Sequence, residues 1–385
     1  MTVEQELIAH ARRIAAEVAP RGAEIEAARR IPRDLHKAMG DAGFYRMFVT
    51  TDCDGLEVSP RTAAEVYEAL AQGDAACGWV AFIAATTTLA FGRMTPAAVC
   101  EIMARPDSLA TGVFAANGVA TRVEDGFRVT GRWDWGSGSP NADWIGGGCV
   151  LVEDGETLKN SAGLPRNHML FFRADQVTSL DTWHVSGLSG TGSTAFAVDD
   201  VFVPERHAAG VQVKALADRP LYRFPSFSPL AQGIGGVALG IARGAIDEAT
   251  RVVGEKRRGG SSAPLAERSH TQIEIARAEA RLRAARAFFY QTIDAAWEAA
   301  QSPEPVPLAL SRDMRLAVNH AVSESTAAVD AMYTLAGGSS IYAVSPLQRQ
   351  FRDIHVATQH FMVSPNILET VGRLFLGLPT NTAGF

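Results

Sequence analysis

Two histidines near the C-terminus, His355 and His360, are candidates for acid–base chemistry. They are five residues apart, so they do not share one face of a helix as a metal-binding pair would. His360 stands shortly before Pro365, where a helix should break. A histidine at a helix end that faces a cavity can serve as acid, base or hydrogen-bond donor near neutral pH. A packing role is the alternative for His360.

A tryptophan-rich segment is the second candidate. Residues 127–144 read FRVTGRWDWGSGSPNADW and contain three tryptophans and a Gly-Ser-Gly sequence. A strand that lays an indole and a hydroxyl against a planar cofactor would use this composition. An aromatic cluster at the edge of a sheet would use it as well, and the composition alone does not separate the two interpretations.

Two further segments are rich in glycine. Residues 181–193, DTWHVSGLSGTGS, combine Trp183 and His184 with a loop that offers backbone donors and room for a ligand. A lone histidine in a loop is more often structural than catalytic, so both interpretations of His184 stay open. Residues 233–236, GIGG, lack the preceding strand and parallel sheet that a dinucleotide-binding loop needs. Close helix packing explains these glycines better.

The composition limits the class of protein. The 385 residues are 47% hydrophobic and 20% charged, which is typical of a soluble globular protein. The net charge of −6 and the lack of a basic stripe indicate no nucleic-acid binding. No signal peptide and no run of about 18 apolar residues is visible, so we expect a cytoplasmic protein without a membrane segment. The four cysteines form no zinc or redox motif, and we expect reduced thiols and no metal.

Three blocks of secondary structure must position the candidate segments. Residues 1–106 have helical apolar spacing, with capped helix starts at Ser59-Pro60 and Thr95-Pro96. Residues 107–215 predict a small antiparallel barrel or sandwich, with a hairpin over 119–130 and strands over 133–135, 144–152, 169–173 and 195–203. Residues 216–385 predict helices over 231–253, 269–300 and 310–336 and a fourth within 344–377. The predicted fold is α+β and mostly α: an N-terminal helical domain, a central β-barrel domain and a C-terminal four-helix bundle domain.

The order of these blocks resembles the acyl-CoA dehydrogenase superfamily over essentially the whole chain. Residues 242–253 (ARGAIDEATRVV) and 335–353 (LAGGSSIYAVSPLQRQFRD) resemble that family's third-domain helix and its cofactor-contacting loop. The segment GRWDWGSG resembles the strand that carries W-x-T or W-x-S against the flavin. The resemblance implies that Trp135 lies beside the isoalloxazine and Ser137 near its N5 edge. It also implies flavin contacts from Phe114, Ala115, Asn117, Gly337, Gly338 and His360.

Within the superfamily, the chain resembles the oxygenase components of two-component flavin-dependent monooxygenases that hydroxylate aromatic compounds. The similar patterns are the strand end WGSG, the loop DTWHVSGLSGTGS followed by VDDVFVP, and the helix RDIHVATQH. The resemblance implies that Ser137 and His360 are catalytic and flank the reactive edge of the flavin. It implies substrate contacts from Trp183, His184, Phe227 and Phe361. Similar loops often have arginine at the position of Ser189, which puts any contact expected from that arginine in doubt.

The resemblance also implies a reaction. Reduced FMN, with FADH2 as the alternative, would come from a separate NAD(P)H:flavin reductase, because no NAD(P)H-binding unit is visible. Its reaction with O2 gives a C4a-hydroperoxide that the protein must shield from water. Ser137 can accept or donate a hydrogen bond at N5, and His360 can hydrogen-bond the peroxide or deprotonate a phenol. Relatives with this fold assemble as tetramers, so we expect a homotetramer by analogy.

An acyl-CoA dehydrogenase or oxidase with an atypical base is the main alternative. A dehydrogenase needs a carboxylate that removes the α-proton of the thioester. The resemblance gives two positions for this acid, Phe361 and the helix near Leu230. The first position is a phenylalanine. The second has no acid nearby, because the sequence between Arg219 and Ile246 contains no Asp or Glu. A non-catalytic protein that kept the fold is the third hypothesis.

Overall fold

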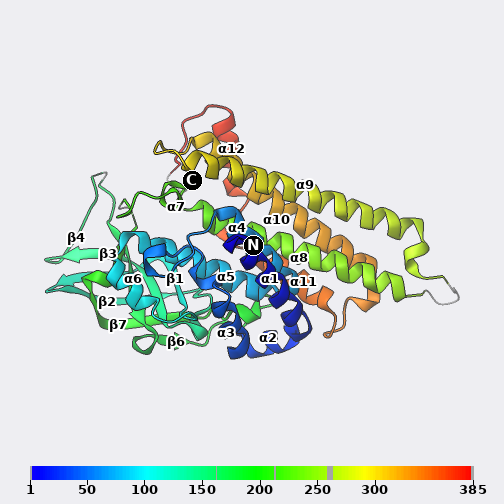
Figure 1. Cartoon of the computed structure of the whole chain (residues 1–385), viewed down its shortest axis with the longest axis horizontal. Coiled ribbons are helices and arrows are strands. Elements are labelled where there is room, and N and C mark those ends of the chain that lie inside the picture. The colour runs from blue at the N-terminus through cyan, green and yellow to red at the C-terminus, as the bar shows by residue number, and fades with distance from the viewer. Residues whose placement is uncertain (1, 162, 212–213, 258–262, 383–385) are drawn as a thin grey trace.

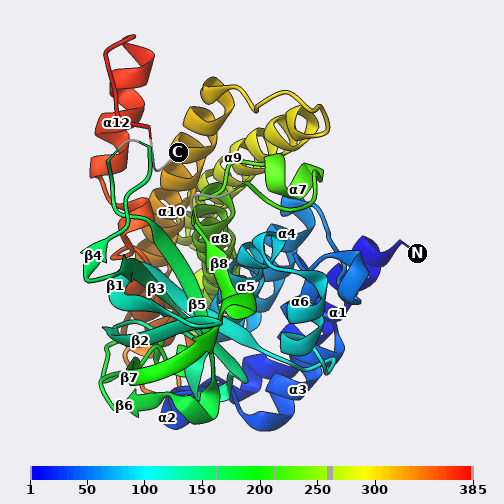
Figure 2. The same ribbon diagram turned by 90° about the vertical axis from the view of Figure 1, so that its left-hand side faces the viewer.

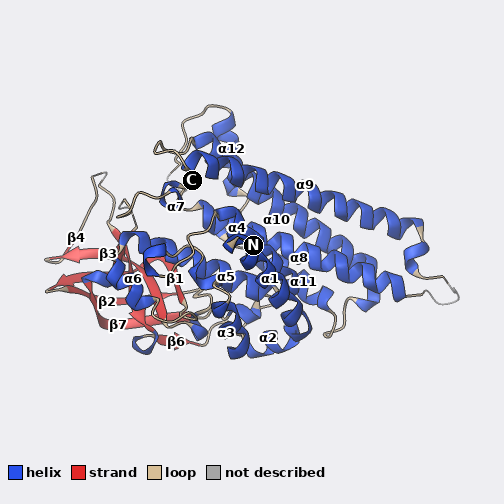
Figure 3. Cartoon of the chain, viewed as in Figure 1, coloured by secondary structure: helices blue, strands red, loops and turns tan. Residues whose placement is uncertain are grey.

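The computed structural model describes residues 2–161, 163–211, 214–257 and 263–382. Helices come first, strands occupy the middle of the chain and helices return at the end (Figure 3). This order agrees with the three blocks expected from the sequence. The sheet lies at one end of the molecule, and the long C-terminal helices run away from it (Figure 1).

The N-terminal helices begin close to the predicted start signals. The side chain of Ser59 accepts a hydrogen bond from the backbone of Thr62, and Pro60 takes the first helical position as predicted. Thr95 makes no side-chain cap, although Pro96 follows it. The helices of this region are α1 (Val3–Val18), α2 (Gly22–Ala28), α3 (Arg33–Asp41), α4 (Pro60–Gly73), α5 (Ala75–Thr88) and α6 (Pro96–Ile102).

One helical stretch, Ala75–Arg93, is long and apolar enough to cross a membrane by length and composition, whereas the sequence analysis expected no such run. In the fold, 89% of its most apolar window is buried inside the protein. The core helix of a folded protein has this property, because a helix surrounded by other elements is apolar on every side.

The central region forms one sheet in the order β6-β7-β2-β1-β3-β5-β8, and β4 pairs with β3. The predicted hairpin is present, with Val123 opposite Gly126. The expectation of a purely antiparallel sheet was wrong, because β1 and β3 are parallel. Residues 134–143 carry the chain from β2 back past β1, so β3 enters in the same direction as β1. The strands are β1 (Ala110–Val123), β2 (Gly126–Trp133), β3 (Trp144–Glu153), β4 (Glu156–Thr157), β5 (Asn167–Arg173), β6 (Thr178–Leu180), β7 (Ala195–Pro204) and β8 (Ala208–Gly210).

The C-terminal helices pack closely through small residues. A side chain at Gly233 would collide with Phe82 of α5, and one at Gly240 would collide with the backbone of Glu68. This confirms the packing interpretation of the glycine-rich segment. The helices are α7 (Pro220–Arg223), α8 (Ser228–Glu255), α9 (Ser269–Ala300), α10 (Leu308–Ala336), α11 (Pro346–Ala357) and α12 (Asn366–Phe375).

Helix α5 connects the two helical regions with the sheet. It packs against α4 and α8, and buried residues of all three helices belong to one hydrophobic core. It also packs against β1. Figure 2 shows α5 beside α4 and α8, with the sheet next to them. Side chains on α5 can therefore contact the sheet on one side and the C-terminal helices on the other.

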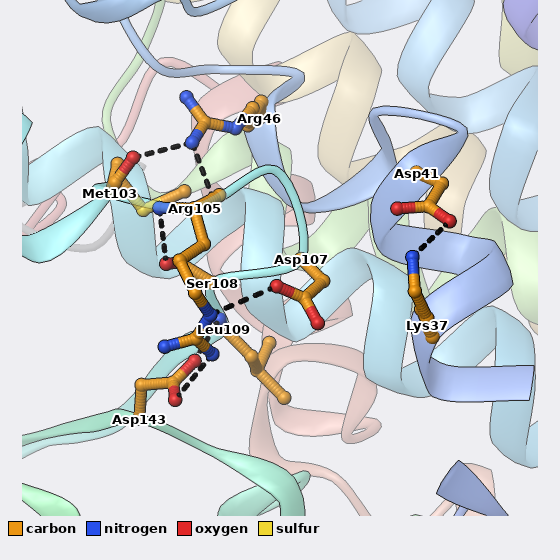
Figure 4. A network of polar contacts seen from close by, with 9 residues as sticks. All are labelled: Lys37, Asp41, Arg46, Met103, Arg105, Asp107, Ser108, Leu109 and Asp143. Carbon is orange, nitrogen blue, oxygen red and sulfur yellow. Dashed lines mark hydrogen bonds and ion pairs between the residues drawn. The ribbon is translucent and has the colours of Figure 1, made fainter. Parts of the chain in front are cut away.

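A polar network fixes the start of the sheet against the N-terminal helices (Figure 4). Arg46 donates a hydrogen bond to the backbone oxygen of Arg105 at 2.6 Å. The guanidinium of Arg105 pairs with Asp143 at 2.8 Å, and Asp143 accepts a hydrogen bond from the backbone of Leu109 at 3.1 Å. Leu109 directly precedes β1 and Asp143 directly precedes β3, so this network holds the entry points of both strands.

The expectation of four reduced thiols was wrong for one pair. Cys53 and Cys100 form a disulfide, with their Cα atoms 5.1 Å apart. The two cysteines are 47 residues apart and have no motif spacing, so only the packing of the turn Thr51–Cys53 against α6 brings them together. Cys77 and Cys149 are buried thiols, and burial raises the pKa of both.

Candidate functional site

Ser137 lies in the loop that follows β2. The chain leaves the sheet at Trp133, and Trp135 has a φ of 65°, so the strand expected over 133–135 ends early. The backbone oxygen of Ser137 accepts a hydrogen bond from the hydroxyl of Thr111 in β1, and its side chain is buried. The Ser137 hydroxyl lies 3.1 Å from Trp79 Nε1 and 2.7 Å from Ser193 Oγ.

These contacts continue into a chain of hydroxyl groups. Ser193 Oγ lies 2.6 Å from Thr191 Oγ1, and Thr191 donates to the backbone oxygen of Leu188 at 2.8 Å. Each hydroxyl has one proton, so the donation by Thr191 fixes the direction of the rest. Trp79 donates to Ser137, Ser137 to Ser193, and Ser193 to Thr191. We call these four residues the hydroxyl chain; in it, the proton of Ser137 is directed inward.

His360 follows α11, at the helix end expected from Pro365. Its Nδ1 accepts a hydrogen bond from the backbone N–H of Met362 at 3.2 Å. Burial lowers the pKa of His360 to about 4, because the charged imidazolium loses its hydration. The ring is therefore neutral near pH 7, and its proton lies on Nε2. His360 presents a hydrogen-bond donor at Nε2 and not a lone pair.

Trp79 of α5 brings Ser137 and His360 together. Its indole nitrogen holds the Ser137 hydroxyl, and its ring meets His360 edge to face with the centroids 6.1 Å apart. The sequence analysis did not find Trp79, because the sequence does not distinguish a tryptophan at a site from a core tryptophan in an apolar helix. It also missed Thr191 and Ser193, although it singled out their loop for its glycine, serine and threonine content.

Two exposed aromatic rings flank this cluster. Trp135 is 73% exposed and stands two residues before Ser137. Phe361 is 66% exposed and stacks on His360 with ring centroids 4.9 Å apart. These two rings are the exposed aromatic surfaces next to Ser137 and His360 in the sequence. A planar aromatic cofactor fits these surfaces, with a hydroxyl and a neutral imidazole as its polar neighbours.

The other residues expected to contact the flavin lie in two separate places. The pairing of β1 with β3 shifts between Val113 and Gly118, which leaves Ala115 and Asn117 exposed on β1. Gly337 and Gly338 follow α10, where Lys256 at the end of α8 donates to the backbone oxygen of Ala336. Helix α8 has 28 residues, so this loop lies about 40 Å along it from its first turn.

A cavity of about 70 Å³ lies at the C-terminal end of α5. Phe114 and Phe227 line it, and so does Thr86, which is about 10 Å along α5 from Trp79. Leu230 also lines it, and none of the described residues around it is Asp, Glu or His. The position near Leu230 therefore brings no acid into the cavity, and Phe361 brings none to the cluster around His360.

Trp183 and His184 are not part of the hydroxyl chain, although Trp183 contacts the same backbone oxygen as Thr191. Trp183 Nε1 donates to the backbone oxygen of Leu188 at 3.2 Å. His184 is exposed and contacts Arg29, which also pairs with Asp181 at 2.8 Å. The loop thus uses its later residues, Thr191 and Ser193, in the hydroxyl chain, while Asp181 and His184 contact Arg29, the residue after α2.

A group of buried charges lies at the N-terminal end of α5. Asp74 caps the helix by accepting a hydrogen bond from Ala76, and its carboxylate is 3.9 Å from Arg349. Asp353 accepts a hydrogen bond from the backbone of Leu188 at 2.6 Å. We call Asp74, Arg349 and Asp353 the charged cluster. Burial raises the pKa of both carboxyls, and that of Asp353 reaches about 7. Ser189, where similar loops have arginine, lines a small cavity beside this cluster.

No group of metal-binding side chains occurs in the part of the chain that the structure describes. His355 does not join His360, and it pairs with Asp330 at 2.9 Å.

Comparison with known proteins agrees with this geometry. Residues 2–95 match the acyl-CoA dehydrogenase N-terminal domain, and residues 232–365 match the acyl-CoA dehydrogenase C-terminal domain. The indole-3-acetate monooxygenase of Pseudomonas putida is 34% identical over 355 residues, which cover 92% of this chain and 89% of that protein. The indole-3-acetate monooxygenase of Acinetobacter baumannii is 30% identical and covers 90% of this chain and 88% of that protein.

A solved structure is similar over nearly the whole length. XiaF from Streptomyces, in complex with FADH2 and glycerol, has a TM-score of 0.89 at 25% identity and covers 99% of this chain and 98% of its own. The two domain matches and the long alignments to monooxygenases lead to one family. The chain belongs to the flavin-dependent monooxygenases of the oxygenase-component type, within the acyl-CoA dehydrogenase superfamily.

Proposed function

We propose that this monooxygenase takes a reduced flavin from a separate NAD(P)H:flavin reductase and uses O2 to hydroxylate a small aromatic compound. The observation that supports the proposal is that Ser137 and His360 both contact the indole of Trp79. Ser137 accepts its hydrogen bond, and the His360 ring packs against it edge to face. An indole ring is the first candidate substrate, because two relatives at 30% identity or more are indole-3-acetate monooxygenases.

We propose that Trp135 and Phe361 hold the flat ring of the flavin and that Ser137 contacts its N5 edge. When bound, reduced flavin would supply the two electrons that activate O2, from which one oxygen atom passes to the substrate and the other leaves as water. The proton of Ser137 is directed to Ser193, so Ser137 would accept a hydrogen bond from the N5–H of the reduced ring. The oxidised ring has no hydrogen at N5. This polarity therefore favours the reduced flavin.

His360 would act as a hydrogen-bond donor. Its Nδ1 is occupied by the Met362 backbone, and its low pKa makes it a weak base near pH 7. A donor at Nε2 stabilises negative charge that develops on oxygen, and such donors contribute about 10²–10³-fold to the rate in other enzymes. Of the two roles expected for His360, the geometry supports the donor and gives no support to the base.

The cavity at the end of α5 would receive the substrate. Its walls are mainly apolar and include Phe114, Phe224 and Phe227. Such walls exclude water, which protects the oxygen-transfer reaction. The absence of an acid among its described residues argues against removal of an α-proton from an acyl-CoA thioester.

The identity of the flavin and the assembly are further parts of the proposal. FMN is the proposed flavin, with FADH2 as the alternative, and the solved structure of XiaF holds FADH2. We propose that Gly337 and Gly338, beside the C-terminal end of α8, contact the flavin of a second copy of the chain. A homotetramer would provide one, and light scattering measures its mass. A cytoplasmic location remains the expectation from the sequence.

The test is a single-turnover experiment with labelled oxygen. Protein mixed anaerobically with chemically reduced FMN is exposed to ¹⁸O₂ in the presence of indole. We expect one labelled oxygen atom in the product by mass spectrometry and no NADH consumption by the protein alone.

Free reduced FMN without protein is the control and should yield hydrogen peroxide only. Bleaching of the oxidised flavin by an acyl-CoA under anaerobic conditions, together with no labelled product from any aromatic compound, would replace this proposal with the dehydrogenase alternative.

A further inference from the structure

The loop that leads into the hydroxyl chain lies directly against α11. Gly187 is so close to this helix that a side chain there would collide with the backbone of Arg352. The guanidinium of Arg352 donates to the backbone oxygen of Ser186. Asp353, which is buried, accepts a hydrogen bond from the backbone N–H of Leu188 at 2.6 Å. Three consecutive residues of the loop are therefore fixed by two consecutive residues of α11.

Leu188 has a backbone conformation that needs such support. Its φ of 53° and ψ of 27° lie in the left-handed region, which costs free energy for any residue with a side chain other than that of glycine. A strained backbone persists only where its surroundings hold it. A hydrogen bond to a carboxylate is stronger than one between neutral groups. The bond to Asp353 therefore stabilises the conformation that Leu188 adopts.

The carbonyl oxygen of Leu188 is the last acceptor of the hydroxyl chain. It accepts hydrogen bonds from Thr191 Oγ1 at 2.8 Å, from the Thr191 backbone N–H at 3.0 Å and from Trp183 Nε1 at 3.2 Å. Of these three donors, only the hydroxyl can rotate to another acceptor, because Ser193 Oγ lies 2.6 Å from it. The position of the Leu188 oxygen therefore decides which way the proton of Thr191 points.

We propose, on the basis of the proposed contact between Ser137 and the flavin, that Asp353 is a positioning residue for the reaction. Asp353 holds Leu188, and this keeps the proton of Thr191 on the Leu188 oxygen. Ser193 then donates to Thr191, and Ser137 donates to Ser193. The Ser137 oxygen is left to accept the hydrogen bond of the N5–H of the reduced ring. Asp353 acts through the loop and needs no contact with the flavin.

Loss of the Asp353 oxygen would allow the chain to reverse. With Leu188 released, Thr191 can donate to Ser193, and Ser193 can donate to Ser137. The proton of Ser137 would then point to N5, which favours the oxidised ring because that ring has no hydrogen there. A carboxyl oxygen accepts a hydrogen bond in either protonation state, and so does the oxygen of an amide. Asparagine at position 353 should therefore preserve the direction of the chain.

The test measures the dissociation constants of oxidised and reduced FMN by anaerobic fluorescence titration and compares their ratio. Asp353→Ala should shift the ratio toward oxidised FMN by about 3- to 10-fold, the effect of one net hydrogen bond. Asp353→Asn should stay within about 2-fold of the wild type. Asp175→Ala is the control and should leave the ratio unchanged, because Asp175 is an exposed aspartate that pairs with the exposed Arg173. Circular dichroism checks each fold, and Asp353→Leu, which also lacks an acceptor, replaces Asp353→Ala if that variant does not fold.

A double variant separates this role from a general loosening of the structure. Ser193→Ala removes the link between Thr191 and Ser137, so Asp353→Ala added to Ser193→Ala should not shift the ratio further. Two independent effects would multiply instead. Multiplied effects, or an unchanged ratio in Asp353→Ala while Ser193→Ala shifts it, would overturn the proposal.

The same titrations distinguish a failure of this role from a failure of the proposed function. No shift in Ser193→Ala would show that Ser137 does not face N5, and the proposed flavin contact would fail together with the role of Asp353. Because binding is measured without turnover, the expected shifts in a protein that forms no hydroxylated product would contradict the proposed function alone.

Discussion

Helix α5 contributes to two buried polar groups. Its N-terminus belongs to the charged cluster, and Trp79, one turn later, belongs to the hydroxyl chain. The first group contains ionisable side chains and the second contains none. The charged cluster at its N-terminus holds two carboxylates and one guanidinium. The hydroxyl chain around Trp79 contains no charge, and each of its protons has a single acceptor. The two groups meet at the backbone of Leu188, whose N–H donates to Asp353 and whose oxygen accepts a hydrogen bond from Thr191.

The two groups therefore differ in how their protonation depends on pH. The protonation of the charged cluster changes near neutral pH, and that of the hydroxyl chain does not. Burial of two nearby carboxyls raises the pKa of Asp353 to about 7, so the charge of this cluster changes near neutral pH. The hydroxyl chain does not titrate, and His360 beside it stays neutral down to about pH 4. The groups proposed to contact the flavin thus keep one protonation state near neutral pH, while the charged cluster does not.

Removal of the only cation of the charged cluster should have the largest effect. Arg349→Met leaves Asp74 and Asp353 without the guanidinium, and loss of one partner from a buried ionic group costs about 3–5 kcal/mol in the free energy of unfolding. Urea unfolding at pH 7.5 measures it. The loss should shrink at pH 5, where the carboxyls hold protons. Arg173→Met should change the free energy of unfolding by less than about 0.5 kcal/mol. If Arg349→Met lowered the free energy of unfolding by less than about 1 kcal/mol, the charged cluster would not depend on its cation, and the contrast with the uncharged hydroxyl chain would not hold.

The second prediction tests the neutral donor. His360→Ala should lower the ratio of hydroxylated product to hydrogen peroxide about 10²-fold in single turnovers, because the Nε2 donor is lost. His360→Gln keeps an N–H donor and should recover part of the ratio, which a general base would not allow. His355→Ala is the control on the same segment, since His355 pairs with Asp330. A wild-type ratio that rises with protonation near pH 6.5 would contradict a neutral His360.

The third prediction concerns the pH dependence of stability. The pKa of Asp353 is higher in the folded protein than in the unfolded chain, so the folded state binds more protons between about pH 4 and pH 7. Its contribution to stability is therefore present at low pH and is lost as the pH rises through this window, by up to about 1.4 kcal/mol per pH unit.

Asp353→Asn keeps a neutral side chain and should lack this loss. Its free energy of unfolding, compared with that of the wild type, should improve as the pH rises from 5 to 7.5. His360 acts in the opposite direction in both proteins, because its pKa is lowered, and it cancels in the comparison. A constant difference across this range would show that Asp353 keeps an ordinary pKa.

The smallest expected effect comes from changing the direction of the hydrogen bond that Ser137 donates. Ser193→Ala removes the acceptor of the Ser137 proton and allows Ser137 to donate at N5. The affinity for oxidised FMN should rise relative to that for reduced FMN, by about 3- to 10-fold. Anaerobic fluorescence titrations of both forms measure it. Ser179→Ala, at an exposed serine of β6, is the control. An unchanged ratio would mean that Ser137 does not face N5.

The sequence by itself determined most of the helices and strands. Apolar spacing, Ser59-Pro60 and the turn at Glu124-Asp125 act over a few residues, so they predict helices and the hairpin without knowledge of distant contacts. The local sequence also placed His360 at a helix end, but the expected roles of His360 and Ser137 came from the resemblance to the flavin-dependent monooxygenases.

The tertiary structure decided which of these groups meet and in which protonation state. Trp79 joined the cluster because α5 lies against both the sheet and α8, a contact that no local pattern encodes. The disulfide of Cys53 and the parallel pairing of β1 with β3 likewise depend on long-range packing. The direction of the hydroxyl chain and the lowered pKa of His360 arise from burial and from partners far away in the sequence. Hydrogen bonds and desolvation act across space, so residues as distant as Trp79, Ser193 and His360 acquire a common role only when the chain folds.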